Sequence, residues 1–345
     1  MADLGSQRNP PPPSLKALLC YSLTQSSNTE QEAGAPIDEA RAPIDDTGAP
    51  IDEAGTPIVV VCPSSGEWPV AAAKSLETHG FCVLTSTSHQ PLVPHAVCSA
   101  CRDAVESRLE DLLGRVGRRG YERDDEFRFA EIVHREGRRY DMPLDWSAGG
   151  AGSVGARRLA AAAFTGDEQA AFDALHGRLD VIARAAMGAV VARAAGETRE
   201  AKGGGEGVRS SSSGQLLEGT SEAEPPMAGC VISAPGASAQ AWHSDGSAYG
   251  LFNLFVPLVP LTALNGPTEI RPSTHRNAGS TSGFVAQRTA PLLGTGDVLI
   301  FDYRCRHRGL ANGGEETRPV AYVTYAIGGA QDKHNFPDAS TLAFD

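Results

Sequence analysis

The second half of the chain consists of short apolar runs separated by turn-forming residues, and this pattern constrains the fold more than any other feature. Glycine, proline and asparagine stand between the runs, which are Cys230–Ser233, Leu251–Leu258, Glu269–Arg271, Val298–Tyr303 and Val320–Ile327. Short strands broken by such residues are typical of an all-β sandwich or barrel. We therefore expect a core of two β-sheets from Met227 onward.

The first half of the chain is predicted to contribute helices. Residues 68–79 (WPVAAAKSLETH) have helical character, Gly80 is the expected stop, and Phe81–Leu84 follows as a short strand. Apolar residues recur with helical spacing over 94–118, and residues 168–195 form a second amphipathic pattern. Helices followed by a β-rich half predict one α+β domain whose core is mainly β.

The N-terminal segment carries an acidic repeat that cannot form a coiled coil. Residues 35–58 read APIDEAR, APIDDTG, APIDEAG and TPI, with a proline in every unit. Proline breaks the helix that heptads need, and acidic sequence poor in large apolar groups does not build a core. We expect a disordered tail over 1–56 and a folded domain over 57–345, with a flexible Gly/Ser-rich insertion at about 197–226.

The charge distribution argues against a nucleic-acid partner. The net charge is −12, and residues 1–56 hold nine acidic against three basic residues, which accounts for half of it. No basic stripe offers the clustered Lys and Arg side chains that phosphate contacts need. No run of about 18 apolar residues is present, so no membrane partner is expected either.

Seven cysteines are scattered through the sequence without the spacing of a disulfide framework. This usage is typical of a reducing compartment, and the N-terminus shows no secretory signal. We expect a cytoplasmic protein that is a monomer or a weak oligomer. Cys98 and Cys101 form a C-x-x-C in a helical stretch with no second pair, which favours two structural cysteines over a metal or redox site.

A histidine and an aspartate in the β-rich half are placed to bind a metal. In the segment AWHSDG, His243 and Asp245 are two residues apart, so their side chains leave the same face of a strand or extended turn. His307, just past the run Val298–Tyr303, is the candidate third ligand. Two histidines and a carboxylate that leave metal positions open are typical of non-haem iron(II) oxygenases.

Arg318 lies eleven residues after His307, at the start of the last apolar run. A hairpin from His307 would return its guanidinium to the metal, where it can hold a carboxylate with two parallel hydrogen bonds. Asn312 is expected to bond the loop behind His307, and His275 to brace a turn. Residues 138–141 (RRYD) can approach a substrate or form a structural salt bridge, and both interpretations stay open.

Three segments together resemble the phytanoyl-CoA dioxygenase family of iron(II)/2-oxoglutarate oxygenases. They are PGASAQAWHSDG, NGPTEIRPSTHR and GDVLIFDYRCRHRGLANGGEETRPVAYVTYA, in this order over residues 227–328. A weaker match reaches the N-terminal helix and strand and the segment GRRYDM. The resemblance implies a double-stranded β-helix, or jelly roll, with flanking N-terminal helices.

The resemblance also implies roles for individual residues. His243, Asp245 and His307 match the metal ligands, and Arg318 matches the arginine that holds the distal carboxylate of 2-oxoglutarate. Asn253 and Phe255 align with positions that line the cosubstrate pocket. Gly309 departs from the pattern, because some members have a hydroxyl residue there that helps bind the carboxylate. That contact must then come from elsewhere, with Thr268 or a water as candidates.

The function expected from these residues is hydroxylation of a small organic substrate, with decarboxylation of 2-oxoglutarate to succinate. Its cofactors would be iron(II), 2-oxoglutarate and O2, with ascorbate as reductant. Asp245 fills the ligand position that related halogenases leave to chloride, which favours hydroxylation. Two alternatives are a non-catalytic metal- or ligand-binding jelly roll, which would need no carboxylate clamp, and a cupin-like metalloenzyme, which usually has more histidines.

Overall fold

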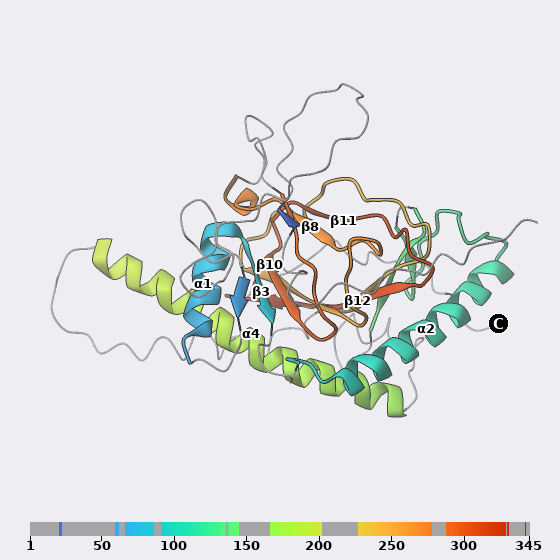
Figure 1. Cartoon of the computed structure of the whole chain (residues 1–345), viewed down its shortest axis with the longest axis horizontal. Helices are drawn as coiled ribbons and strands as arrows, with labels where there is room; N and C mark the ends of the chain where they lie inside the picture. Colours follow the sequence, from blue (N-terminus) through green and yellow to red (C-terminus); the bar gives the residue numbers. More distant parts are fainter. Residues whose placement is uncertain are drawn as a thin grey trace, which may run out of the picture.

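The computed structural model describes residues 21–22, 59–61, 66–85, 91–135, 137–144, 166–201, 227–277, 288–328, 330 and 342. These residues form two β-sheets, with the long helices covering one side (Figure 1). Apart from Tyr21–Ser22, the predicted tail 1–56 lies outside the described residues, as do residues 202–226 of the predicted insertion. No helix in the described ranges has the length and apolarity needed to cross a membrane.

The large sheet has eight strands in the order β2-β3-β10-β7-β12-β6-β5-β4. Its neighbours are antiparallel except for β2 and β3, which are parallel. In chain order the strands are β2 (Val59–Val61), β3 (Phe81–Thr85), β4 (Val133–His134), β5 (Arg139–Pro143), β6 (Met227–Ser233), β7 (Leu251–Pro257), β10 (Val298–Asp302) and β12 (Arg318–Ala326). Four of the five predicted apolar runs form its central strands.

The small sheet has the order β1-β9-β8-β11. Its strands are β1 (Tyr21–Ser22), β8 (Thr268–Ile270), β9 (Thr289–Ala290) and β11 (His307–Gly309), and the 3-10 helix η3 (Thr274–Asn277) follows β8. The fifth predicted run corresponds to β8. A buried cluster joins the sheets, because Ile270 of β8 packs with Phe81, Leu299 and Phe301 of the large sheet. The mainly β core with helices is therefore confirmed.

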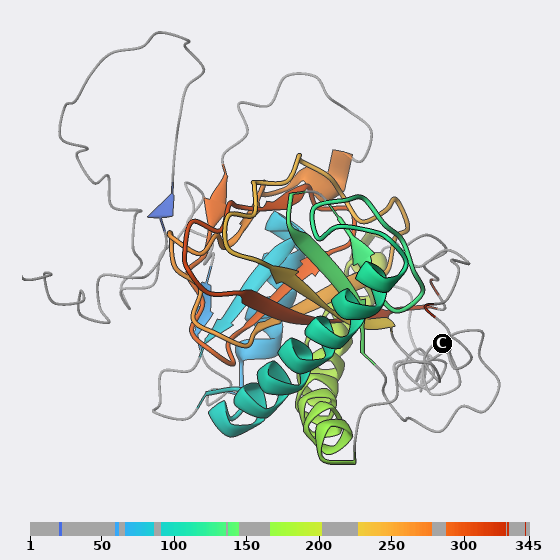
Figure 2. The same ribbon diagram turned by 90° about the vertical axis from the view of Figure 1, so that its right-hand side faces the viewer.

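Three helices pack against the large sheet: α1 (Trp68–His79), α2 (His95–Arg118) and α4 (Gly166–Ala201). Figure 2 shows α2 and α4 side by side on this face. The stop of α1 is as predicted, because Gly80 has a φ of 80° and its N–H bonds the Leu76 carbonyl. The predicted end of α4 was wrong. A single glycine, Gly196, does not end a helix that good helix formers continue, so residues 197–201 belong to α4 rather than to the insertion.

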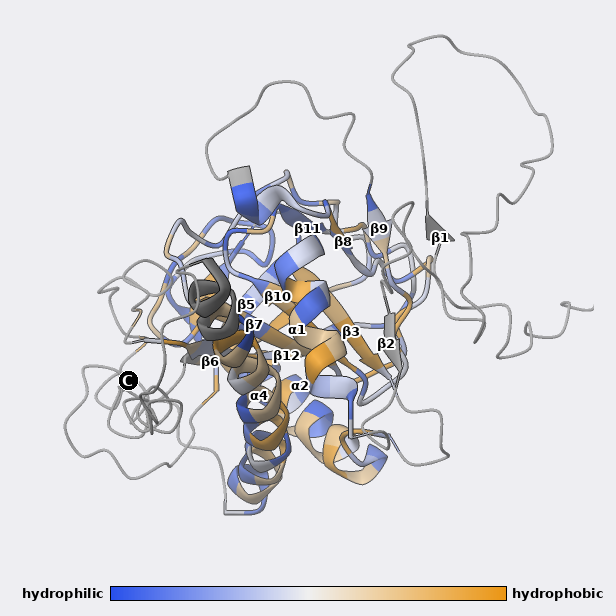
Figure 3. Cartoon of the chain, turned by 90° about the vertical axis from the view of Figure 1, so that its left-hand side faces the viewer, coloured by the Kyte–Doolittle hydropathy of each residue, from blue (hydrophilic) through white to orange (hydrophobic). Residues whose placement is uncertain are grey.

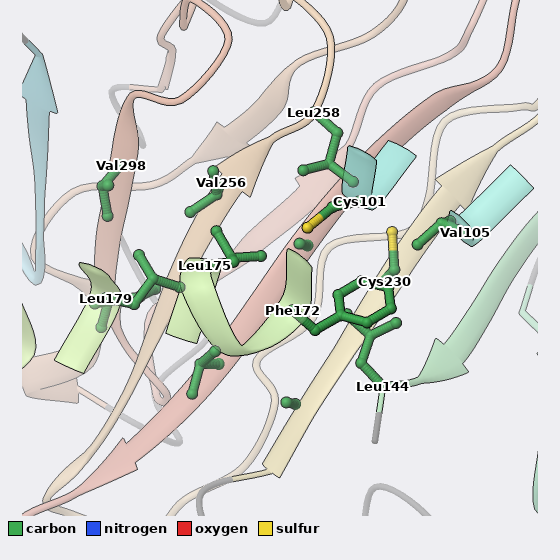
Figure 4. Close-up of a cluster of buried hydrophobic side chains, with 14 of the residues drawn as sticks. Cys101, Val105, Leu144, Phe172, Leu175, Leu179, Cys230, Val256, Leu258 and Val298 are labelled. Atoms are coloured by element: carbon green, nitrogen blue, oxygen red, sulfur yellow. The ribbon is translucent and has the colours of Figure 1, made fainter. Parts of the chain in front are cut away.

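Alternation along the strands separates the two faces of the large sheet. On β12, Ala321 and Val323 belong to the cluster under the helices, whereas Arg318, Val320, Tyr322 and Thr324 line a cavity on the other face. Figure 4 shows Phe172, Leu175 and Leu179 of α4 against Val256 of β7 and Val298 of β10. Hydrophobic residues of α1, α4 and the strands beneath them gather at this interface (Figure 3).

Candidate metal centre

His243, Asp245 and His307 meet at one point between the two sheets. Their ligand atoms lie within 4.8 Å of one another, the one such group of His, Cys, Asp and Glu side chains found in the described residues. Backbone hydrogen bonds hold residues 243–245 against residues 303–307. The His243 and His307 N–H groups each donate to the other's carbonyl, at 3.1 and 2.8 Å, and the Asp245 N–H donates to the Tyr303 carbonyl at 3.1 Å. Residues far apart in sequence are thus fixed as a triad.

Both imidazole rings are oriented for metal binding through Nε2. The Nδ1 atom of His243 lies 2.9 Å from the Ala241 carbonyl, and Nδ1 of His307 lies 3.0 Å from the Cys305 carbonyl. A carbonyl only accepts, so each Nδ1 carries a proton, and in the neutral ring Nε2 keeps the lone pair that binds a metal. Burial and the neighbouring ring of His307 lower the pKa of His243, which favours the neutral form that binds a cation.

Asp245 is positioned by a chain of two further side chains. Asn253 Nδ2 donates to Asp245 Oδ2 at 2.6 Å, and the Thr324 hydroxyl donates to Asn253 Oδ1 at 2.6 Å. Asn253 and Thr324 are both buried. The carboxylate also lies 3.7 Å from His307 Nε2. Asn253 therefore fixes the carboxylate that faces the metal position.

The triad opens into a cavity of about 180 Å³. The structure brings all of the predicted site residues to it, namely His243, Asp245, His307, Arg318, Asn253, Phe255 and Thr268. Phe255 packs edge-on against Phe301, whose ring in turn lies 4.7 Å from the His307 ring. The apolar packing on this side holds the third ligand in place. The cosubstrate roles of these residues remain predictions.

Arg318 is a buried cation at the cavity wall. It is 2 % exposed, its Nε makes one long contact of 3.4 Å to the Asn265 carbonyl, and its Nη2 is buried without a hydrogen-bond partner in the described part of the chain. Burial, together with the nearby guanidinium of Arg139, lowers the pKa of Arg318 to about 9. A buried cation in this state favours an anion beside it.

The route that brings Arg318 to the site differs from the predicted hairpin. β11 belongs to the small sheet, where it pairs with β8, whereas β12 pairs with β6 and β7 in the large sheet. The connection therefore crosses between the sheets. Asn312 anchors it, but by donating to the Ser233 and Glu316 carbonyls at 2.9 Å rather than by orienting His307.

A polar network lines the cavity beside the triad, and sequence reasoning missed two of its residues, Arg135 and Tyr322. Arg135 donates to Asp141 Oδ2 at 2.6 Å, and the Tyr322 hydroxyl donates to Asp141 Oδ1 at 3.0 Å. Burial opposes the charge of Arg135, but Asp141 more than offsets it and raises the pKa of Arg135. The position of Tyr322 could have been predicted, because it lies four residues after Arg318 and thus on the same strand face.

Residues 138–141 divide between the two interpretations left open above. Arg138 pairs with Asp124 at the surface, at 2.8 Å, which is a structural ion pair. Tyr140 belongs to the apolar cluster under the helices. Arg139 and Asp141 line the cavity, as alternation along β5 requires.

A facial triad of two histidines and a carboxylate beside a buried arginine defines a class of metal-dependent oxygenases. The sequence model of the phytanoyl-CoA dioxygenase (PhyH) family matches residues 76–320. This match covers well over half of the chain, and the chain therefore belongs to the phytanoyl-CoA dioxygenase family. Membership supports a dioxygenase-type function.

Individual proteins match this chain over a smaller share of its length or at low sequence identity. Dioxygenase FrzG from Cladobotryum sp. is 33% identical over 99 residues, which cover 23% of this chain and 32% of that protein. The chain thus spans about a third of the length of this curated relative. AviO1 from Streptomyces viridochromogenes is a similar solved structure, with a TM-score of 0.44 and 18% identity over 76% of this chain and 97% of that one.

Two further solved structures belong to nogalamycin biosynthesis. The non-haem alpha-ketoglutarate-dependent epimerase SnoN has a TM-score of 0.43 and 15% identity, over 77% of this chain and 85% of that one. The carbocyclase SnoK, also alpha-ketoglutarate-dependent, has a TM-score of 0.44 and 12% identity, over 79% and 93%.

Proposed function

We propose that this protein is an iron(II)- and 2-oxoglutarate-dependent dioxygenase that hydroxylates a small organic substrate. The observation that carries the proposal is the buried Arg318 guanidinium, which has no carboxylate partner in the described residues and lines the same cavity as the triad. We also propose that its two sheets form the double-stranded β-helix implied by the family resemblance.

The donor set fits iron(II). Two imidazole Nε2 atoms and one carboxylate would hold the ion and leave it open positions, which an oxygenase needs for cosubstrate and O2. Bound iron(II) would supply O2 activation coupled to the oxidative decarboxylation of 2-oxoglutarate, with ascorbate keeping it reduced. Asp245 provides the third ligand, so hydroxylation is favoured over halogenation.

The charges of the cavity fit a dianionic cosubstrate. Three arginines (Arg135, Arg139, Arg318) and two aspartates (Asp141, Asp245) line it. A divalent cation at the triad leaves an excess of three positive charges, and 2-oxoglutarate neutralises two of them. Arg318 would hold the distal carboxylate, and the aromatic rings of Phe255 and Tyr322 would keep water from this end of the ligand.

These observations weigh against the two alternatives. A non-catalytic jelly roll gains nothing from a buried arginine without an anionic partner, because such a group costs stability. A cupin-like metalloenzyme that works without a cosubstrate likewise has no use for a carboxylate clamp. A small-molecule substrate, rather than a nucleic acid or a membrane, fits a cavity of this size.

Titration of 2-oxoglutarate into the anaerobic iron(II)-loaded protein tests the proposal. The charge-transfer absorbance of the complex measures binding. Arg318→Ala leaves a carboxylate without its partner, at a cost of about 2–5 kcal/mol. The dissociation constant of 2-oxoglutarate should rise roughly 30- to 4,000-fold, while iron content stays unchanged. Arg318→Lys should recover part of the loss, since it keeps the charge without the fork.

Arg304→Ala is the matched control, because this arginine pairs with Asp302 at 2.7 Å and does not line the cavity. It should bind 2-oxoglutarate like the wild type. Equal 2-oxoglutarate affinity in wild type and Arg318→Ala contradicts the clamp. Absence of succinate release from the wild type, in air with iron(II), 2-oxoglutarate and ascorbate, contradicts the activity.

A further inference from the structure

The space beside Gly309 is taken by the guanidinium of another residue. A Cβ at position 309 would lie 2.5 Å from Arg139 Nη1 and 3.0 Å from Gln240 Oε1, and the first of these is closer than real Cβ contacts. Gly309 does not have a positive φ, so its backbone conformation does not require glycine. The absence of a side chain at 309 is therefore explained by room for Arg139.

Arg139 and Arg318 stand on either side of one residue in the large sheet. Ser233 of β6 is in register with Arg139 of β5 and with Arg318 of β12. Neighbouring strands lie roughly 4.8 Å apart, so the two arginine backbones are about 10 Å apart. Both side chains line the cavity. Two cations thus share one end of the site, opposite Gly309 and its register partner Thr268.

The Arg139 guanidinium is held rigidly in this place. It is fully buried, its Nη1 donates to the Ser233 hydroxyl, and its Nη2 donates to the Ser238 and Leu310 carbonyls at 3.0 and 3.1 Å. Arg318 has a single long contact by comparison. The two arginines therefore differ in what they can do: Arg318 has donors to offer, and Arg139 offers a fixed charge.

We propose that Arg139 is the second cation of the cosubstrate pocket, occupying the volume that a hydroxyl side chain at position 309 would need. Its charge attracts the distal carboxylate that Arg318 bonds directly, and so selects a 2-oxo acid with two carboxylates over one with a single carboxylate. Arg139 is a positioning and specificity residue. This inference rests on the proposed function for the identity of the anion, but not for the existence of the pocket.

A purely structural role would give different results. As a brace, Arg139 would hold the loops at Ser238 and Leu310 and affect every ligand of the cavity equally. As an electrostatic partner, it would affect only ligands that carry the distal charge. The comparison of 2-oxoglutarate with 2-oxovalerate, which has the same chain length and no distal carboxylate, separates the two.

The test is an anaerobic titration of both acids into the iron(II)-loaded protein, for wild type, Arg139→Met and Arg308→Met. Arg139→Met removes the charge with little change in volume, and should weaken 2-oxoglutarate at least about tenfold while changing 2-oxovalerate less than about twofold. Arg308→Met should change neither, because Arg308 pairs with Glu269 outside the cavity. Equal weakening of both acids, or none of 2-oxoglutarate, overturns the proposal.

The contact between Arg139 and Gly309 is tested by a double-mutant cycle. If Arg139→Met does not fold, Gly309→Ser alone tests the contact, and an unchanged 2-oxoglutarate affinity in that variant overturns it. Gly309→Ser should displace the Arg139 guanidinium and weaken 2-oxoglutarate. In Gly309→Ser/Arg139→Met the new hydroxyl has room, so the double variant should bind 2-oxoglutarate better than the two single losses predict when multiplied. Strictly multiplicative losses overturn the size complementarity.

A metal-free measurement separates this inference from the proposed function. Glutarate should raise the melting temperature of the metal-free wild type more than pentanoate does, and this difference should shrink in Arg139→Met. If it does so while the wild type releases no succinate, the two-cation pocket stands and the oxygenase activity fails. If succinate is released but glutarate and pentanoate stabilise equally, the two-cation pocket fails and the activity stands.

Discussion

The two faces of the large sheet show opposite solutions for side chains on the same strands. Toward the helices, residues such as Leu254, Ala321 and Val323 are fully or almost fully buried in one apolar cluster. Toward the small sheet, Asn253 and Thr324 are buried too, but they are polar and bonded to each other. Adjacent residues on β7 or β12 therefore face the apolar cluster and the cavity alternately.

This contrast shows what each face contributes. Apolar burial at about 25 cal/mol per Å² stabilises the helix side without any specific geometry. The cavity side loses stability through buried charges such as Arg318, which gain a partner only when an anion binds. The apolar face toward the helices therefore supplies the stability that the charged cavity lacks. Substitutions on this face should change stability, and substitutions on the cavity face should change ligand binding.

The largest effect is expected from the metal ligands. His243→Ala, Asp245→Ala and His307→Ala should each abolish iron binding and turnover while the fold remains, because each removes one of only three protein donors. His275→Ala is the matched control: this buried histidine lies 3.2 Å from the Glu77 carbonyl through Nε2 and belongs to η3. It should lower the melting temperature and keep the iron. Iron content after anaerobic loading decides, and full occupancy in any ligand variant would remove that residue from the site.

The converse effect is expected on the helix side. Leu254 is fully buried under the helices, next to Asn253 in sequence. Leu254→Ala should lower the free energy of unfolding by about 2–5 kcal/mol, through lost burial and the cavity left behind. Binding of 2-oxoglutarate by the folded protein should change less than about twofold. Urea unfolding and anaerobic titration measure the two quantities; a large loss of affinity with little loss of stability would break the separation of the faces.

A smaller effect is expected from the residues behind Asp245. Asn253→Ala removes the donor to the Asp245 carboxylate, and loss of such an outer partner weakens metal binding by roughly 10- to 100-fold. Thr324→Val removes only the donor to Asn253 and should weaken it less. Competition with a chelator gives both constants. An order reversed between the two variants would contradict the chain from Thr324 through Asn253 to Asp245.

The apolar face was the more predictable of the two. Helical spacing of apolar residues located α2 and α4, and short apolar runs between turn residues located the central strands. The short strands β4 and β9 have two residues each and leave no pattern that a sequence window can detect. The end of α4 was misplaced because the residues after 195 lack apolar periodicity, although residues 197–201 continue the helix.

The charged face was predictable only where a motif marks it. His243 and Asp245 were found by their spacing, and Arg318 by its distance from His307. Arg135 was not assigned and the role of Asp141 was left open, because the other partner of Asp141, Tyr322, lies 181 residues away in sequence. The relation of Arg139 to Gly309 needs the distance between them and has no local signal.

The smallest effect is expected from the N-terminal segment, which belongs to neither face. Of residues 1–56, the structure describes only Tyr21–Ser22, which pair with Thr289–Ala290 at the edge of the small sheet. Strand β9 keeps its other neighbour, β8, when β1 is removed. The proline repeats and acidic charge cannot build a core of their own.

Deletion of residues 1–56 should therefore change the free energy of unfolding by less than about 1 kcal/mol, which is the scale of one net hydrogen bond. It should leave the 2-oxoglutarate dissociation constant within about twofold of the full-length value, because no described residue of the segment lines the cavity. Thermal unfolding and anaerobic titration of the truncated and full-length proteins compare the two. A drop in stability as large as that of Leu254→Ala would show that this segment packs against the domain, and a loss of affinity alone would place it at the cavity.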